Sequence, residues 1–566
     1  MNWLYNRALV GALLVCVGLT GCSDDTEEAA PEAQSKAAAA ASGGGGQSPL
    51  LAYIPDDTPY FLANESEISD DLVDLIWEMA EPGLGYAEAA IAAKLAEGTD
   101  DPAEQAVLEE LSGKLNREGL SELGLDPGGN MAIYGLGVLP VLRAEITDSS
   151  ALKATISRIE EKSGKAIPKV NRGGIEYYEL GDAEGTIIVS VNDNQVVMGV
   201  TPTIAKDTVL DQILGIEKPA RSVADSGRIS DLNKEFGLLP VATLFVDPPA
   251  LVDAVLSDDS EAAQMMFSEE RAKMTPACVA EIRGMAEIMP RMVSGYTALD
   301  RSRMDQVAHA ELRSDIAQSL QGLMIPMAGM GQEAGGLFNF ALAFDLLKTK
   351  QFLIDRAAAV SAEPYQCAEL ADINTGMAEL QTKLSQPLPP MVGNIQGLRI
   401  NIKEAEMAAG GMPTNLRALV MVGMTNPQLI VGMASAFVPQ MATLQMDTNG
   451  TPVPVPPNVI PFPLDEPHVA MMNHGLAFSV GVGEQDNLKS FLDAELPDEP
   501  SFITMGYDAA AMQMYQQQMM QTMAAMSGEA GMPDMPAPAD LLDRVHATIS
   551  FSDKGVDIVS TSTLKP

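Results

Sequence analysis

Histidine is the side chain best suited to proton transfer near neutral pH, and it occurs only four times in the 566 residues. His309 and His546 lie in segments expected to close the two halves of the chain. His468 and His474 flank two methionines, which suits either a hairpin or a soft-metal site. Nucleophile elbows, the His-Glu-x-x-His motif and phosphate-binding loops are absent. We therefore expect no catalytic residue, no metal and no cofactor, with an enzyme of unfamiliar type as an alternative.

Methionine is abundant, with 34 residues. Met512, Met519, Met523 and Met526 recur at spacings of seven, four and three, which places them on one face of a helix. Thioethers fill irregular cores, and they also form adaptable apolar surfaces. The four methionines are accordingly candidates for an apolar groove as well as for core packing. Thioethers also bind Cu(I), so copper binding is a further alternative.

The N-terminus is expected to carry a targeting signal. An apolar run from Ala8 to Leu19 is too short to cross a bilayer, which takes about 20 residues, and it fits a secretory signal peptide over residues 1–21. The run ends Leu19-Thr20-Gly21-Cys22, which resembles the lipobox of bacterial lipoproteins. The resemblance implies cleavage before Cys22 and acylation of that cysteine, while an unmodified secreted protein is the alternative. Ser23 stands where aspartate would mark inner-membrane retention, which implies the outer membrane, facing the periplasm or the cell surface.

Two cysteines remain in the body of the chain, Cys278 and Cys367. Export would place them in an oxidising compartment, where an even pair forms a disulfide more often than two free thiols. The bond would close a loop of about 90 residues and stabilise the protein by at most about 4–5 kcal/mol in the chain-entropy model. Two cysteines and four histidines are too few to predict a structural zinc site.

Residues 22–49 are expected to form a tether that follows the lipidated cysteine. Their acidic, alanine-rich and glycine-rich composition cannot bury enough apolar surface to offset the entropy lost on ordering. A flexible chain of this length spans about 30 Å. The whole protein carries a formal net charge of −42, which repels nucleic acid and anionic head groups. The predicted membrane contact is therefore covalent lipid on Cys22, and nucleic acid is excluded as a partner.

One local unit recurs along the chain: a β-rich run, then Asp, Asn or Thr as a turn and helix cap, then an apolar-periodic helix. The first half contains it four times, and the second half repeats the series in the same order. Paired strands then close each half. The units begin with the runs 60–64, 141–148, 195–202 and 243–249 in the first half and 340–345, 419–427, 476–482 and 503–508 in the second.

The repetition predicts two copies of one α+β module, at residues 50–325 and 337–566, joined by a Gly- and Met-rich junction at residues 326–336. Many strands alternate apolar and polar residues or end in tight turns. We therefore expect mainly antiparallel sheets with helices packed on one face. The opening Ile54-Pro55-Asp56-Asp57-Thr58-Pro59 and the strand–helix order resemble an uncharacterised family of large bacterial secreted proteins, which supplies no catalytic residues to transfer.

The functional expectation is a non-catalytic lipoprotein of the outer membrane whose body binds or organises another component of the cell envelope. The alternative is a carrier or sensor of an apolar ligand or lipid in a methionine-rich groove.

Overall fold

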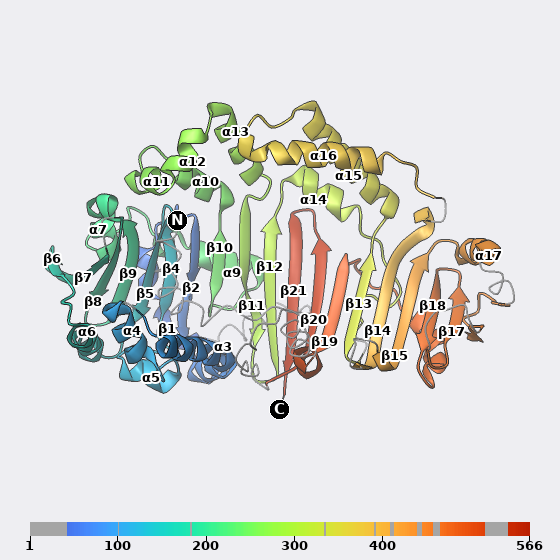
Figure 1. Ribbon diagram of the computed structural model, residues 1–566, viewed down its shortest axis with the longest axis horizontal. Helices are drawn as coiled ribbons and strands as arrows, with labels where there is room; N and C mark the ends of the chain where they lie inside the picture. Colours follow the sequence, from blue (N-terminus) through green and yellow to red (C-terminus); the bar gives the residue numbers. More distant parts are fainter. Residues whose placement is uncertain are drawn as a thin grey trace.

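The computed structural model describes residues 42–565, apart from residue 100 and the segments 182–183, 333–334, 390–391, 408–412, 438–443, 457–463 and 515–540. The fold is α+β, as the sequence predicts, and both helices and strands are substantial. Nineteen strands pair antiparallel in one sheet that runs through both halves of the chain (Figure 1). A two-stranded sheet, β1 (Ser42–Gln47) with β3 (Ser66–Ile68), stands apart from it. The predicted tether over residues 22–49 is therefore wrong for residues 42–47, because their backbone groups pair with those of β3.

From one outer strand to the middle of the large sheet, the first half of the chain contributes ten strands. These are β6 (Lys169–Arg172), β7 (Ile175–Gly181), β8 (Gly185–Val191), β9 (Gln195–Pro202), β5 (Leu139–Glu145), β4 (Met131–Leu136), β2 (Tyr60–Ala63), β10 (Thr243–Val246), β11 (Arg291–Leu299) and β12 (Arg303–Glu311).

The other half of the sheet begins at the pairing of β12 with β21, and it contains nine strands of the second half. These are β21 (Gly555–Leu564), β20 (Leu542–Phe551), β19 (Ile503–Asp508), β13 (Phe338–Ala343), β14 (Ile395–Met407), β15 (Pro413–Met424), β18 (Gly475–Val480), β17 (His468–Met472) and β16 (Val453–Pro454).

The strand order is symmetrical about the β12–β21 pair, with corresponding strands of the two halves at equal distances from it. Outward from this pair, the first half places β11, β10, β2, β4, β5, β9 and β8 where the second places β20, β19, β13, β14, β15, β18 and β17. The cross-strand register agrees as well: Val307 faces Val559, and further out Thr243 faces Ala63 as Thr504 faces Ala341. Both halves therefore share one strand topology, and they are fused into a single sheet through β12 and β21.

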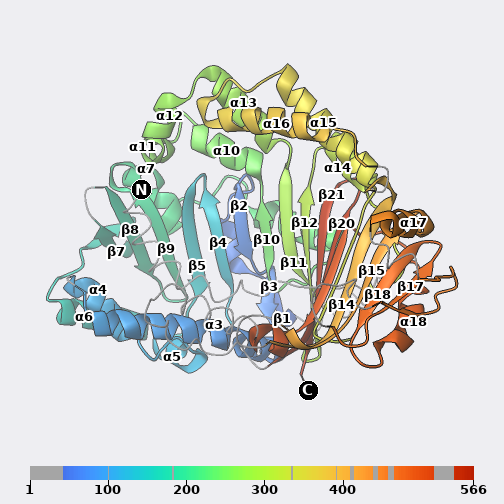
Figure 2. The same cartoon turned by 45° about the vertical axis from the view of Figure 1, so that its right-hand side comes forward.

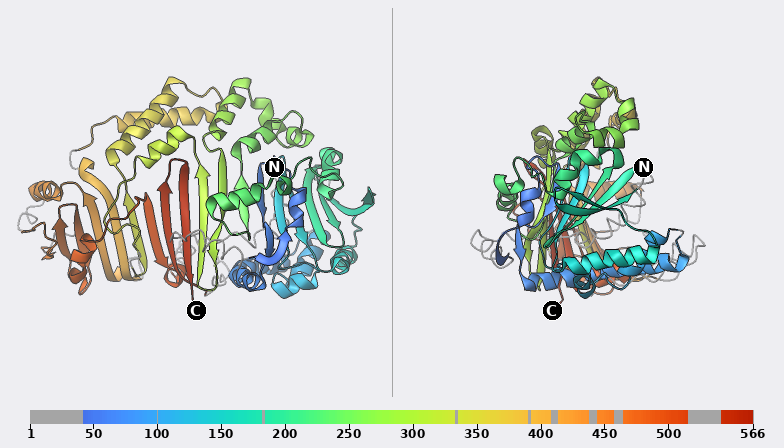
Figure 3. Two further views of the ribbon diagram at one scale, coloured as in Figure 1. Left: turned by 180° about the vertical axis from the view of Figure 1, so that it is seen from behind. Right: turned by 90° about the vertical axis from the view of Figure 1, so that its left-hand side faces the viewer.

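Helices lie behind the sheet and along its two long borders, which are formed by the ends of the strands (Figures 1 and 3). We call these borders the lower and upper edges. The edge drawn below carries α3 (Asp70–Glu97), α4 (Pro102–Leu111), α5 (Arg117–Glu122) and α6 (Ser149–Ser163). The edge drawn above carries α10 (Pro248–Leu256), α11 (Glu261–Met266), α12 (Ser268–Lys273), α13 (Pro276–Ala286), α14 (Ser314–Gln321), α15 (Leu346–Ala362), η4 (Ala368–Leu370) and α16 (Ala371–Leu384).

The back of the sheet packs against short helices. The main core there joins strand residues such as Phe61 and Phe245 to Leu210 and Ile213 of α7 and to Ile229 of α9. In the second half, Leu488 and Leu492 of α18 pack against Met421. The bounds of these three and of the remaining helices are η2 (Pro49–Tyr53), η3 (Thr203–Ala205), α7 (Lys206–Leu214), α8 (Val223–Ser226), α9 (Arg228–Phe236), η5 (Val392–Asn394), α17 (Pro427–Phe437), η7 (Glu484–Asn487) and α18 (Leu488–Leu492).

The predicted caps start several of these helices. Asp148, Asp247 and Asp345 follow strands, and their carboxylates accept hydrogen bonds from free N–H groups in the first turns of α6, α10 and α15. Pro248 occupies the first turn of α10, where its missing N–H costs nothing. Strand–cap–helix units read from the sequence are thus real local structures at these positions.

Candidate functional site

The residues singled out by the sequence fall in different places. Cys22 lies outside the described residues, as do Met519, Met523 and Met526. Met512 lies in a helical turn just after β19 and is half-buried. The proposed methionine face is therefore described at one position only.

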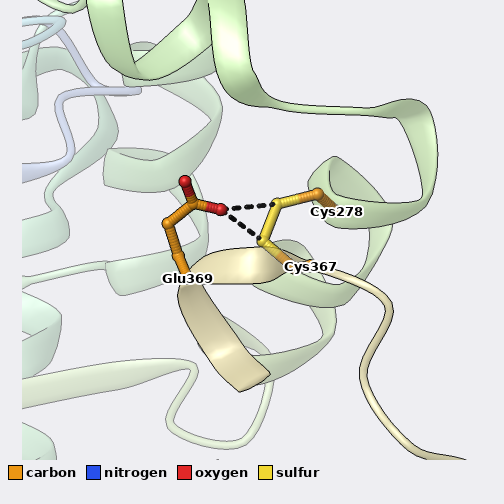
Figure 4. A group of neighbouring side chains, drawn as sticks. All are labelled: Cys278, Cys367 and Glu369. Atoms are coloured by element: carbon orange, nitrogen blue, oxygen red, sulfur yellow. Dashed lines mark hydrogen bonds between the residues drawn. A yellow bond between two sulfur atoms is a disulfide. The ribbon is translucent and has the colours of Figure 1, made fainter. Parts of the chain in front are cut away.

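Cys278 on α13 and Cys367 just before η4 are joined in a disulfide, and both residues are buried (Figure 4). The Glu369 carboxylate lies 3.2 Å from the sulfur of Cys367. These three residues form the one cluster in the described part of the chain with the composition of a metal site. The two sulfurs are bonded to each other, so neither is a thiolate ligand. The cluster links a helix of the first half to one of the second.

The four histidines do not converge in a site. His309 on β12 contacts Asp557 on β21 through Nδ1 at 2.6 Å, and His546 lies on β20. Because β12 corresponds to β21 and β20 to β11, the two histidines are not at equivalent positions in the two halves. The His468 and His474 rings contact separate backbone oxygens, those of Glu466 and Leu492.

The two faces of the large sheet differ in burial. Many residues that point backward are buried, including Phe61, Tyr134, Val197 and Phe245, whereas Val307 and Val559 on the central strands are half-buried. Their neighbours in the strands point the other way, and along the middle of the sheet most of them are half-buried. Nearer one end of the central strands, Met304 and Leu564 are buried in a cluster with Leu72 and Leu75 of α3. In the described part of the chain, no helix passes in front of the central strands β12, β21 and β20, and the sheet bends so that the helical edges flank this face (Figures 1 and 2). The middle of the front, which these helices leave uncovered, is accordingly called the open face of the sheet.

One row of cross-strand neighbours crosses this face through both halves. We call these fifteen residues the front row. Thirteen are Val, Ile, Leu or Met, fourteen are half-buried, and Ile558 is 44% exposed. In order, the front row is Val189, Met198, Leu142, Ile133, Leu62, Leu244, Ser294, Ala308, Ile558, Ile549, Ile503, Leu342, Leu398, Val422 and Leu476.

The row on the back face, one residue along each strand, shows what a covered row looks like in this sheet. It holds small residues such as Ala63 and Ala341, and it also holds the buried arginines Arg143 and Arg399. Arg143 donates hydrogen bonds to the carbonyl oxygens of Gln212 and Ile213 at the C-terminal end of α7. A backward-facing polar group such as Arg143 thus forms hydrogen bonds with the helix packed on it. The front row consists of apolar side chains, apart from Ser294.

The sequence alone does not single out the front row, because an apolar strand residue is ordinarily a core residue. Two strands nevertheless carry a pattern that indicates a second apolar face. Strand β15 contains the unbroken apolar run from Ala418 to Val422, and β8 contains Ile187-Ile188-Val189. Continuous apolar runs are typical of strands whose two faces both contact apolar material. A surface of this kind can bind apolar partners by burial, and it carries no nucleophile.

Comparison with known proteins gives no match among protein-family models, curated proteins or solved structures. None of the described helices combines the length and the apolar character needed to cross a membrane.

Proposed function

We propose that the protein is a non-catalytic lipoprotein of the outer membrane that binds another component of the cell envelope through the open face of its sheet. The front row carries this proposal. A large contiguous apolar surface on a protein marks a site of interaction with protein, membrane or ligand. Here that surface is formed by both halves of the chain together, so the fused sheet has a use that neither half would serve alone.

The extent of the front row favours a macromolecular partner. Neighbouring strands lie about 4.8 Å apart, so fourteen steps cover about 65 Å along the sheet. The hydrocarbon core of a whole bilayer is about 30 Å thick, so one acyl chain extends about 15 Å. A single lipid would cover a small part of the row, whereas an extended apolar surface of a protein could cover most of it.

The lipid anchor is the second part of the proposal. The Leu19-Thr20-Gly21-Cys22 motif supports acylation of Cys22, and two or three acyl chains suffice for stable anchoring. A tether over residues 22–41, with a span of about 25 Å, would let the sheet approach partners close to the membrane surface. Mass spectrometry of the mature N-terminus tests this part: a free thiol at Cys22, or a retained leader, contradicts it.

A carrier of an apolar ligand or lipid is the second candidate, and the same apolar row is the observation that favours it. Several acyl chains side by side would then occupy the face. The alternatives of copper binding and unfamiliar catalysis gain no support from the described residues, because the candidate ligands and acid–base groups do not converge there.

Site-specific photocrosslinking separates the two candidates. A photoreactive residue replaces Ile558 in the full-length chain, and Ile204, an exposed isoleucine outside the front row, serves as the matched control. Crosslinking is done in intact envelopes. A discrete protein adduct from position 558 alone supports the docking function, and lipid adducts from that position alone support the carrier. Equal labelling at both positions, or none at 558, contradicts a binding role for this face.

The Ile558→Glu variant provides a second test. It places a charge in the open face, at a position exposed enough for the fold to tolerate it, and should abolish the adduct formed from a probe at a neighbouring front-row position. Ile204→Glu should leave that adduct unchanged. Loss of the adduct in both variants would indicate a general effect of added charge and would contradict the assignment.

A further inference from the structure

A cavity of about 390 Å³ opens on the back of the first half, on the other side of the sheet from the front row. It lies between α9 and the adjoining ends of β10, β11 and β12. The Phe245 ring forms part of its wall, and charged side chains form most of the remainder. The volume falls in the range of small-ligand sites, about 300–1,000 Å³.

Most carboxylates of this cavity already have partners. Asp56 pairs with Arg221 at 3.4 Å. Glu235 pairs with Arg291 at 2.8 Å, and Arg291 also pairs with Glu311. The carboxylate of Asp247, the fourth in the lining, accepts the N–H of Ala250 as the cap of α10. These contacts hold the walls of the cavity in place and leave two charged groups to consider.

Arg228 is the first of these groups. Its guanidinium lies over the Phe245 ring, 4.0 Å from the centroid, and donates a hydrogen bond to the backbone carbonyl of Asp56. Within the described chain no carboxylate lies within ion-pair distance of it, and burial lowers the pKa of Arg228 despite the acidic groups around it. A guanidinium has five N–H donors in a planar fork, so Arg228 retains donors that suit an oxyanion.

Asp231, one turn along α9, is the second group. It is exposed and lines the same cavity, and no described cation pairs with its carboxylate. Residues three apart on a helix lie about 5–6 Å apart at Cβ. A cation and an anion without ion-pair partners thus stand side by side at the mouth of one cavity.

We propose that this cavity binds a small zwitterion, with its oxyanion on Arg228 and its ammonium group between Asp231 and Asp247. Five carboxylates and three guanidinium groups line the cavity, so a free anion would meet excess negative charge there and across the whole protein. A simple cation would leave Arg228 without a counter-charge. An ammonium and an oxyanion a few bonds apart satisfy both groups, and free amino acids and phosphoethanolamine head groups share this chemistry.

Calorimetric titration of the full-length protein tests the proposal. The probes are L-serine and glycerophosphoethanolamine, the phosphoethanolamine diester of a lipid head group, with acetate and ethylamine as single-charge controls. At least one zwitterion should bind, and Arg228→Gln should weaken it tenfold or more. Serine binding tighter than glycerophosphoethanolamine would point to a free amino acid as the ligand, and the reverse order to a lipid head group. If neither zwitterion binds better than acetate and ethylamine, the proposal is wrong.

Two further variants separate binding from folding. Asp231→Asn changes an exposed residue that forms no described ion pair, and it should also weaken the zwitterion tenfold or more. Arg283→Gln removes an exposed arginine that pairs with Asp253 outside the cavity, and it should bind like the wild type. Unchanged affinity in Asp231→Asn would overturn the proposed placement of the ammonium group, even if Arg228→Gln cannot be produced in folded form.

Discussion

The imidazole of His309 and the carboxylate of Asp557 meet at 2.6 Å across the seam where the two halves join. His309 is 3% exposed and packs against the Phe236 ring of α9. Four residues away, Thr561 donates to Asp305 at 2.6 Å across the same strand pair. Asp305 and Asp557 stand at equivalent positions about the Val307–Val559 pair, so each half supplies one carboxylate to the other.

Asp557→Asn should destabilise the protein by about 1.5–3 kcal/mol, the range for hydrogen bonds to charged groups. Burial alone would raise the pKa of Asp557, but the hydrogen bond with His309 and further contacts hold that pKa below its usual value. A depressed folded-state pKa gives stability that is present above the unfolded pKa, near 4, and is lost as the pH falls through the folded pKa. Urea unfolding should therefore show a larger difference between wild type and variant at pH 7 than at pH 3.

Asp553→Asn is the matched control for this prediction, because Asp553 lies exposed in the hairpin between β20 and β21. It should unfold with the wild type at both pH values. An Asp557→Asn midpoint equal to that of the wild type at pH 7 would show that the seam does not depend on this pair.

Local structure could be read from the sequence, and the long-range pairing could not. Alternation and turn residues located the strands, and Asp148, Asp247 and Asp345 marked the helix starts. The pairing of β12 with β21 joins residues about 250 positions apart, and neither strand carries a local sign of its partner. The histidine contact at the seam was invisible for the same reason, since His309 and His546 differ from their structural counterparts, Val293 for His546 and Thr561 for His309.

The buried arginines illustrate a second limit. Arg143 on β5 and Arg399 on β14 both bind backbone carbonyls, Arg143 those of Gln212 and Ile213 and Arg399 those of Ala328 and Phe491. Register places Ala132 at the position equivalent to Arg399, and Met421 at the position equivalent to Arg143. A buried arginine therefore binds backbone carbonyl groups in both halves, but from strands that are not equivalent. An alignment of the two halves by position would not pair Arg143 with Arg399.

Arg143→Met should destabilise the protein more than Arg399→Met. The Arg143 side chain is fully buried and also donates to the Tyr134 hydroxyl and the Gln195 amide oxygen. Its loss leaves several buried acceptors without donors, each costing about 1–3 kcal/mol, so about 3 kcal/mol or more is expected in total. Arg399 stacks over the Phe491 ring, and burial lowers its pKa to about 10, so the cost of burying its charge offsets part of its contribution.

Urea unfolding followed by circular dichroism measures this order. The midpoints should rank Arg143→Met below Arg399→Met and both below the wild type. Arg283→Met, which removes an exposed arginine, should match the wild type. An Arg143→Met midpoint at or above that of the wild type would mean that the cost of burying this cation exceeds the worth of its bonds.

Along the upper edge of the sheet, α13 of the first half is linked in two ways to the segment before η4 of the second half. Cys278 and Cys367 form the disulfide across a sequence separation of 89. The Glu281 carboxylate of α13 accepts the N–H groups of Gln366 at 2.7 Å and Cys367 at 2.9 Å. The double variant Cys278→Ala/Cys367→Ala should lose at most about 4–5 kcal/mol, seen as a lower midpoint of thermal unfolding. Glu281→Gln in that background should lower the midpoint further.

Thiol labelling of the denatured, unreduced protein is the direct check of the covalent link. The wild type from intact envelopes should take up no label at either cysteine until it is reduced. Full labelling before reduction would show that the disulfide is absent. A double variant as stable as the wild type would show that the disulfide does not stabilise the protein.

Glu484 is a buried carboxylate that joins β14 and β15 of the second half. Its oxygens contact Lys403 at 2.8 Å and Arg417 at 2.5 Å, and the residue itself has no exposed surface. Burial raises the pKa of Glu484, but the hydrogen bonds from Lys403 and Arg417 outweigh that effect and leave the pKa below its usual value. The stabilisation is therefore present above about pH 4.3 and is lost as the pH falls through the folded-state pKa.

Glu484→Gln should cost about 2 kcal/mol or more at pH 7, because it leaves two cations without their buried partner. The value falls below the usual 3–5 kcal/mol because both cations are partly exposed and can be hydrated again. Glu404→Gln is the matched control: Glu404 is exposed and pairs with the same Arg417, so its loss should cost at most about 1 kcal/mol. Urea unfolding of the three proteins at pH 7 and pH 3 decides the matter. Equal midpoints for the two variants at pH 7 would show that hydrated Lys403 and Arg417 need no buried counter-charge.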